Sequence, residues 1–194
     1  QNLQAAIIKL GGKIRDNADI TLHPEPLLNG EPLAGFDLII DTRGTGAKDH
    51  RPVRGVRGEV LWVQTPEVRL NHAIRLMHPR YKLYIVPKPS QRFIIGATEI
   101  ESSDTSPVSV QSMMELCSAL YTLNPAFAEA RILELDANLR PCYLDNMPHT
   151  EWHSSNQHNT QQQCVSINGL YRHGYLLAPF VVEQFLADFN ARFY

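Results

Sequence analysis

The sequence predicts a mixed fold of the α+β or α/β class, in which an antiparallel sheet with helices is combined with a layer of buried strands. Three observations predict it. Residues 36–40 form a compact apolar run, as expected for a strand covered on both faces. From about Gly55 the pattern changes to alternation of apolar and polar residues, which is typical of antiparallel strands. Residues 110–121 and 181–189 repeat apolar positions at intervals of three and four, as amphipathic helices do.

The composition is that of a globular protein and limits the classes of partner. Of the 194 residues 43% are hydrophobic and 20% are charged, with a formal net charge of −2. Such a chain can bury a sizeable core, as one domain or as parts of two. Its charge balance gives no reason to expect nucleic acid or a membrane surface as partner, and no apolar run approaches the roughly 20 residues of a membrane span.

The cysteines and the first residues bear on the cellular compartment. The three cysteines are odd in number and lack CxxC spacing. Reduced thiols in the cytoplasm therefore fit better than disulfides or a zinc site. Residues 1–4 show neither a basic region nor an apolar region of the kind found in a signal peptide.

The N-terminal segment predicts a helix followed by short strands. Its apolar face consists of Leu3, Ala6, Ile7 and Leu10. Gly11 stands where the cap at the end of a helix belongs. We expect the chain to be a piece of something longer, because it opens inside a helix with no strand before it. Short strand-like pieces follow at 13–22, and 23–33 is rich in proline and glycine, as connections are.

The central region predicts strands, a hairpin and a helix. Apolar residues at 60–63 predict one strand, and those at 83–85 and 93–95 predict a hairpin that turns at 88–92. Ser109 is the expected N-cap of the next helix. The apolar face of that helix is expected at Val110, Met113, Met114, Cys117, Leu120 and Tyr121. Asn124-Pro125 then predicts a cap followed by proline at the first position of a short helix.

The C-terminal third predicts two strands, a long loop and a final helix. The strands are expected at 132–139 and 164–167, and the polar residues 149–163 between them at a surface loop. That loop contains His149, His153 and His158 with Glu151, but their spacings match no common metal-ligand arrangement, so a solvated loop is favoured. The final helix is expected to begin near Pro179. Its apolar face comprises Val181, Val182, Phe185, Leu186 and Phe189.

Three segments carry candidate chemistry. Gly44-Thr45-Gly46 follows a strand but lacks the third glycine of a dinucleotide fingerprint, so a plain tight turn is favoured. Arg140 ends a strand before Pro141, and its planar fork suits a carboxylate, although a structural salt bridge is the stronger interpretation of the tripeptide alone. In residues 168–179 a strand leads through a glycine-containing turn into a helix, which suits either an anion site or a tight corner.

Several motifs in order resemble those of a known family. They are Arg57-Gly58-Glu59, Leu76-Met77-His78-Pro79-Arg80-Tyr81, Tyr84-Ile85-Val86-Pro87, Ile95-Gly96-Ala97-Thr98-Glu99, Leu139-Arg140-Pro141 and Gly169 to Pro179. Together they are similar to the D-amino-acid oxidase superfamily, and specifically to its glycine oxidases of thiamine biosynthesis. The resemblance covers nearly the whole chain, and it favours a flavin site over a plain corner at 168–179.

The resemblance implies a division of the chain between two domains. Residues 1–54 and 138–194 would belong to a Rossmann-like FAD-binding domain, of which this is the C-terminal part, and residues 55–137 to an antiparallel substrate domain. The N-terminal GxGxxG motif that binds the ADP half of FAD in the family does not occur in these residues.

The resemblance also implies site residues. Arg140 would bind the substrate carboxylate and Tyr84 would add a hydroxyl contact. Gly44 would lie near the ADP portion of FAD, and Glu99 would line the active-site region without an assigned role. The residues beside the isoalloxazine ring would be Arg172, His173, Gly174, Tyr175 and Leu176.

The implied reaction is the oxidation of glycine or a small amino acid. Hydride passes to flavin N5, the imine is released to water or to a thiazole synthase, and molecular oxygen is reduced to hydrogen peroxide. The alternatives are another amine substrate, such as sarcosine or a D-amino acid, and a truncated binding module without turnover. Homo-oligomers are common in the family, but the sequence identifies no interface.

Overall fold

A computed structural model describes residues 2–23, 26–48, 50–77, 82–154 and 163–194. The chain forms two compact units. One consists of residues 1–41 with 151–166, and the other of residues 42–150 with 167–194. Residues 78–81 of the Leu76–Tyr81 motif and His158 lie outside the described residues.

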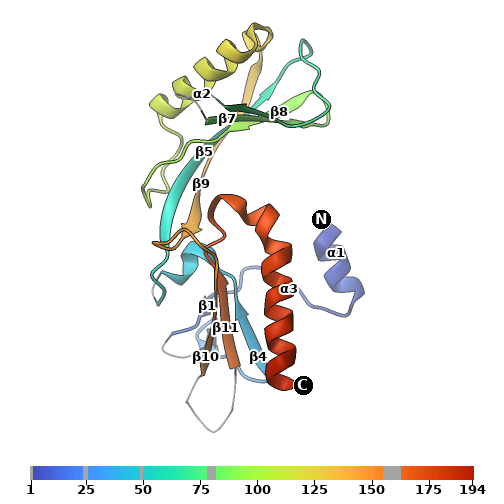
Figure 1. Ribbon diagram of the computed structural model, residues 1–194, viewed down its shortest axis with the longest axis vertical. Coiled ribbons are helices and arrows are strands. Elements are labelled where there is room, and N and C mark those ends of the chain that lie inside the picture. The colour runs from blue at the N-terminus through green and yellow to red at the C-terminus, as the bar shows by residue number, and fades with distance from the viewer. Residues whose placement is uncertain (1, 24–25, 49, 78–81, 155–162) are drawn as a thin grey trace. The chain divides into compact units, whose positions relative to one another are not determined.

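The first unit contains short strands and a parallel strand pair (Figure 1). Its elements are α1 (Asn2–Lys9), β1 (Ile20–Thr21), β2 (Leu27–Leu28), β3 (Glu31–Pro32) and β4 (Leu38–Asp41). The first three strands form a small antiparallel sheet. Strand β4 pairs in parallel with β11 (Gln163–Asn168), and β10 (His149–Ser154) lies on the other side of β11. Gly11, with φ +86°, follows α1 as expected.

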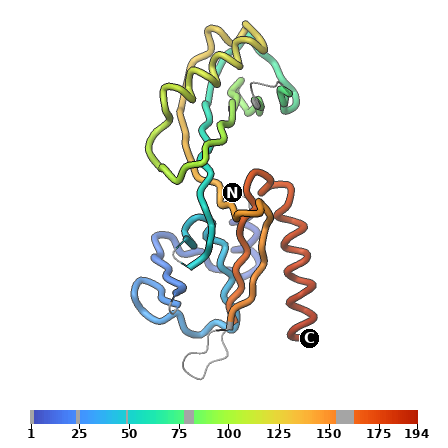
Figure 2. The backbone as a smooth tube through the Cα atoms, turned by 60° about the vertical axis from the view of Figure 1, so that its left-hand side comes forward, coloured from blue at the N-terminus to red at the C-terminus, as the bar shows by residue number. Residues whose placement is uncertain are grey.

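The second unit is built on a five-stranded antiparallel sheet with the strand order β6-β7-β8-β5-β9. Its strands are β5 (Arg54–Gln64), β6 (Ile74–Met77), β7 (Lys82–Lys88), β8 (Arg92–Gly96) and β9 (Arg131–Cys142). Helix α2 (Val110–Leu123) covers one face (Figure 1). Strands β5 and β9 run side by side over most of their length (Figure 2). The predicted antiparallel sheet and its hairpin at β7–β8 are confirmed.

Alternation along the strands gives this sheet two different faces. Leu61, Leu83, Ile85 and Ile95 are fully buried and belong to one apolar core together with three residues of α2, which are Leu116, Ala119 and Leu120. Because side chains point alternately to opposite sides of a strand, the residues between them face away from α2. A row that crosses four strands on this second face is Arg75, Tyr84, Gly96 and Val60.

The caps of α2 match the sequence prediction, and its buried face matches in part, since Leu120 is buried and Met113 and Cys117 pack against the core. The Ser109 hydroxyl accepts a hydrogen bond from the Ser112 amide at 3.1 Å, and the Asn124 side chain caps the short 3-10 helix η2 (Pro125–Phe127). Of the predicted apolar face, Val110 and Met114 are exposed. The face towards the sheet instead centres on Ser112, Leu116 and Ala119, where small side chains allow close approach of the helix.

The C-terminal third departs from the prediction in two places. Helix α3 (Gly174–Phe193) follows η3 (Tyr171–His173) and begins five residues before Pro179. Pro179 is the sixth residue of α3 and lacks a backbone donor, so the helix continues through it with one intrahelical hydrogen bond fewer. Val181 and Phe185 are buried as expected, whereas Val182 and Leu186 are half exposed.

The predicted loop at 149–163 is wrong for its first six residues. His149–Ser154 form strand β10, in which the His149 ring stacks on Tyr143 with centroids 4.3 Å apart. Polar side chains had obscured this strand because its sequence carries little apolar alternation. The described part of the chain contains no group of three metal-ligating side chains placed to hold an ion, and none of its helices is long and apolar enough to cross a membrane.

Candidate active site

The second unit contains a pocket of about 350 Å³ that includes side chains from the sheet face away from α2. Its charged and polar lining comprises Arg75, Tyr84, Thr98, Glu99, Arg140, Arg172 and His173. Of the residues predicted from the sequence, the structure thus brings Tyr84 and Arg140 together with Arg172 and His173. Three guanidinium groups and one carboxylate give this pocket a net positive charge, which suits an anionic ligand.

Arg140 lies over the middle of β5. Its Nη1 donates to the Thr98 carbonyl at 3.1 Å. A Cβ atom on Gly58 would stand 2.4 Å from the guanidinium, so the absence of a side chain at that position leaves room for Arg140. Within the described part of the chain Arg140 forms no ion pair, so the salt bridge predicted from the tripeptide is absent from the described residues. Most of its donors remain available to a ligand.

Tyr84 stands next to this guanidinium on the sheet. It pairs with Gly96, and its hydroxyl lies 3.0 Å from where a Cβ atom on Gly96 would be. Burial raises the pKa of the Tyr84 phenol, and the nearby positive charge of Arg140 offsets only part of that rise. The phenol is therefore protonated at neutral pH, and it can donate a hydrogen bond to a carboxylate.

Glu99 joins the 97–99 segment to the turn before α3. Its carboxylate accepts hydrogen bonds from the Tyr171 hydroxyl and from Arg172 Nη1, the latter at 2.7 Å. Burial, and then the hydrogen bond to Glu99, raise the pKa of Tyr171 to about 12. The segment itself is held to β5 because the Glu59 amide donates to the Thr98 hydroxyl at 2.9 Å. The sequence analysis assigned Glu99 no role, and these contacts show that it holds Arg172 in place.

The remaining predicted cofactor residues do not line this pocket. Gly44 begins the 3-10 helix η1 (Gly44–Ala47) with φ +59°, and its carbonyl accepts a hydrogen bond from the Asn168 side chain at 2.9 Å. Gly174, Tyr175 and Leu176 form the first turn of α3. Tyr175 and Leu176 are exposed, and the N-cap residue His173 provides no side-chain hydrogen bond to this turn.

Two pocket features were missed by the sequence interpretation. Arg75 pairs directly with Tyr84 across β6 and β7, which puts both on one face of the sheet. The register of β6 and β7 would have placed Arg75 opposite Tyr84. That register cannot be deduced from the sequence alone. Gly58 was noted only as part of a motif, because its contact with Arg140 joins residues that are far apart in the chain.

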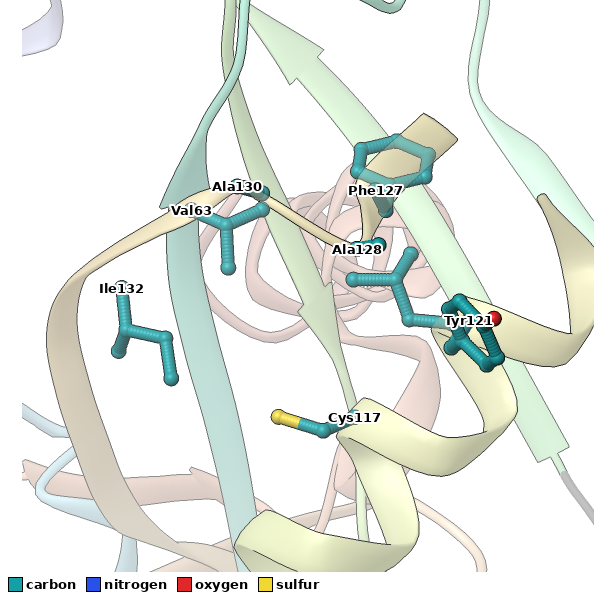
Figure 3. A pocket seen from close by; sticks show the side chains of 8 residues that line it. Val63, Cys117, Tyr121, Phe127, Ala128, Ala130 and Ile132 are labelled. Carbon is teal, nitrogen blue, oxygen red and sulfur yellow. The ribbon is translucent and has the colours of Figure 1, made fainter. Parts of the chain in front are cut away.

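A second pocket lies on the opposite side of the sheet and has a different character. Its volume is about 320 Å³, and Figure 3 shows apolar side chains from α2, β5, β9 and the η2 segment around it. Its only sulfhydryl is that of Cys117, and burial raises the pKa of this thiol. Among the described residues, no charged side chain lines it, and its polar side-chain groups are the Tyr121 hydroxyl and the Cys117 thiol. It thus lacks the guanidinium groups of the first pocket.

Comparison with known families identifies the chain. The profile of the FAD dependent oxidoreductase family, DAO, matches residues 1–184. The chain belongs to this family. The DAO profile covers the first unit, most of the second and every residue of the charged pocket described above.

Individual relatives agree with this membership. The chain is 46% identical over 152 residues to a thiamine biosynthesis oxidoreductase, ThiO, of Rhizobium etli; the match covers 77% of the chain and 44% of that protein. It is 28% identical over 124 residues to a glycine oxidase of Geobacillus kaustophilus, over 64% of the chain and 31% of that protein. The crystal structure of glycine oxidase from Bacillus cereus superimposes with a TM-score of 0.67 at 25% identity, covering 91% of the chain and 47% of that structure. The chain thus spans about half the length or less of these DAO relatives.

Proposed function

We propose that the complete protein oxidises glycine or another small amino acid, with FAD as cofactor and oxygen as electron acceptor. The amine loses a hydride from its α-carbon and a proton from nitrogen, so that a C=N bond forms. Oxygen takes up the two electrons and two protons and leaves as hydrogen peroxide. The observation that carries this proposal is the pair Arg140 and Tyr84, which presents unused donors in a positively charged pocket.

The proposed roles follow from the donors of these two side chains. Arg140 would bind the substrate carboxylate through its planar fork, because Gly58 leaves the guanidinium space and the Thr98 carbonyl fixes its orientation. Tyr84 would donate its phenolic proton to the same carboxylate, since its raised pKa keeps it protonated. Two donors on one carboxylate restrict the orientation of the α-carbon, and such positioning accelerates a reaction between bound groups.

The turn before α3 fits the ring end of FAD. Its first-turn amides receive no side-chain cap from His173, and a Cβ atom on Gly174 would have its nearest neighbour only at 3.9 Å, so a planar group has room. We assign Arg172, His173, Gly174, Tyr175 and Leu176 to this contact and Gly44 to the ADP portion. When bound, FAD would accept the hydride, while the α3 amides would stabilise negative charge at the ring edge.

The domain assignment belongs to the same proposal. Residues 55–137 would form the substrate domain and residues 1–54 and 138–194 the FAD-binding part. The similarity to ThiO of Rhizobium etli supports a role in thiamine biosynthesis, in which a thiazole synthase would receive the imine.

The first experiment measures flavin and mass on one purified sample. We expect denaturation to release about one FAD per chain when the intact mass exceeds that of these 194 residues, and we expect glycine to give hydrogen peroxide. A sample that carries FAD but forms no peroxide from glycine, sarcosine or D-alanine would contradict the proposed function. A sample of the 194 residues alone is expected to release little FAD, because it lacks the GxGxxG motif.

A substitution at Gly58 tests the position of Arg140 without removing it. In Gly58→Ala the new Cβ atom would lie 2.4 Å from the guanidinium, so the end of a flexible side chain must move. We expect about tenfold lower affinity for glycine, because small displacements of a positioning group are costly. The free energy of unfolding should change by less than about 1 kcal/mol.

The matched control is Gly55→Ala on the same strand. Its Cβ atom would contact Leu139 and Ser103 at 3.1 Å and would not touch Arg140. Equal loss of glycine affinity in both variants would show that general strain in β5, and not the displacement of Arg140, is responsible.

A further inference from the structure

Glu99 is the acidic side chain among the described residues that line the charged pocket, and the proposed reaction does not use it. Its side chain is 29% exposed and therefore accessible to a small ligand. The Arg140 guanidinium donates to the carbonyl of Thr98, the residue directly before Glu99, at 3.1 Å. The cation that would bind the substrate carboxylate is thus fixed to the backbone beside the one acidic residue of this lining.

The Glu99 carboxylate is held in place by two neighbours from the turn before α3. The Tyr171 hydroxyl donates to one of its oxygens, and Arg172 Nη1 donates to the other at 2.7 Å. A carboxylate offers about four acceptor sites, so binding these two donors is compatible with accepting a further hydrogen bond from a ligand. Because the carboxylate is already oriented, a ligand donor does not have to order it.

The backbone of Tyr171 indicates that this cluster is more than a surface ion pair. Tyr171 has φ +49°, in the left-handed region that bulky side chains rarely adopt. Its hydroxyl binds Glu99, and the Arg172 guanidinium lies over its ring at 5.1 Å from the centroid. These contacts offset the unfavourable backbone conformation. Such conformations are concentrated at binding and catalytic sites, where the surrounding contacts maintain them.

A cation and an anion on adjacent parts of one pocket suit a small zwitterion. At neutral pH glycine carries its ammonium group and its carboxylate on the same carbon. An ammonium group donates up to three hydrogen bonds, and those to a carboxylate are stronger than the bond that a neutral hydroxyl can donate. A hydroxy acid of the same size fits the same space and binds Arg140 equally, but it brings no positive charge to Glu99.

We propose that Glu99 determines specificity by accepting a hydrogen bond from the substrate ammonium group, while Arg140 and Tyr84 bind the carboxylate. This role rests on the proposed function, and it names the group by which the pocket distinguishes an amino acid from the corresponding hydroxy acid. Glu99 acts in binding the zwitterion. Arg140 serves every small carboxylic acid, with or without an amine.

The test compares glycine with glycolate, in which a hydroxyl replaces the ammonium group. Binding of each to the 194-residue chain is measured by NMR titration near pH 7 at low salt, so that flavin is not required for the readout. We expect Glu99→Gln to lower the affinity for glycine roughly tenfold. The affinity for glycolate should not fall, because removing a negative charge does not weaken the binding of an anion. The ratio of the two affinities should therefore fall at least about tenfold.

A matched control comes from the same segment of the chain. Glu101→Gln removes an equal charge two residues further on, from a side chain that is 66% exposed, pairs with Arg54 and does not line the pocket. It should leave the ratio unchanged. Glu99→Asp keeps the charge on a shorter side chain, and the ratio should fall less than in Glu99→Gln.

Arg140→Gln separates the role of Glu99 from the proposed function. It should weaken glycine and glycolate alike. If it does so while Glu99→Gln leaves the affinity ratio unchanged, or weakens both ligands equally, the role of Glu99 is overturned and the proposed carboxylate site stands. If Arg140→Gln affects neither ligand, or if the unmodified chain binds neither, the proposed carboxylate site fails as well.

Discussion

Arg57→Met is expected to lower the free energy of unfolding by about 3–5 kcal/mol, since removing one partner leaves a buried charge unpaired. Arg57 and Glu59 are 3% and 1% exposed, and Arg57 Nε donates to Glu59 Oε1 at 2.7 Å. The same guanidinium donates to the carbonyls of Asp104 and Pro107, each at 2.8 Å, and so holds the segment that leads into α2. Methionine fills similar space but satisfies none of these acceptors.

Tryptophan fluorescence in a urea titration would measure the lowered free energy of unfolding of the unit that contains the five-stranded sheet. The protein has two tryptophans, and Trp62 lies on β5, the strand that carries the ion pair. A Trp152→Phe background therefore makes the signal specific for the sheet. The control is Arg192→Met, which breaks a half-exposed pair with Asp188 and should cost less than about 1 kcal/mol. Similar losses in both variants would contradict the assignment of Arg57 as a buried structural group.

A double variant separates buried charge from lost packing. In Arg57→Met with Glu59→Leu neither charge of this pair remains, and proteins in which a buried pair is replaced by apolar residues often lose little stability. We expect the double variant to be more stable than Arg57→Met alone. If it is less stable, the lost hydrogen bonds to Asp104 and Pro107 outweigh the unpaired carboxylate of Glu59.

The motif Arg57-Gly58-Glu59 shows what a sequence can and cannot predict. Its residues were recognised together, yet alternation directs them to opposite sides of β5. Arg57 and Glu59 pair in the interior, whereas Gly58 leaves space for Arg140 in the pocket. Strand alternation could be predicted because it is local. The contact of Gly58 with Arg140 and the hydrogen bonds from Arg57 to Asp104 and Pro107 could not, since they depend on β9 and on the 104–107 segment, which only the folded chain brings near.

The difference between local and long-range contacts also separates the other features that could be predicted from the sequence from those that could not. The β7–β8 hairpin and the caps at Ser109 and Asn124 were predictable, because each depends on neighbours within a few residues. The buried face of α2 was predictable only in part, because two adjacent stripes have similar periodicity and packing against the sheet selects between them. The anchor between Glu99 and Arg172 joins residues 73 positions apart and carries no local signal.

Arg140→Ala is expected to lower kcat/KM for glycine by roughly 10- to 150-fold in protein that carries FAD. This corresponds to about 1.5–3 kcal/mol for a hydrogen bond to a charged group. Most of the loss should appear in KM, because the carboxylate is bound before and during the reaction alike. Steady-state peroxide formation at several glycine concentrations gives both constants.

Two comparisons make this result specific for carboxylate binding. Arg140→Lys keeps the charge but loses the planar fork, so it should restore only part of the activity. Tyr84→Phe removes one neutral donor from the same carboxylate and should have the smaller effect, of about 0.5–1.5 kcal/mol. The thermal midpoint of Arg140→Ala should change little, since its only hydrogen bond within the described chain is the one to the Thr98 carbonyl. An unchanged kcat/KM would mean that the carboxylate binds elsewhere, and with Arg172 held by Glu99, Arg75 would be the remaining cation of the pocket.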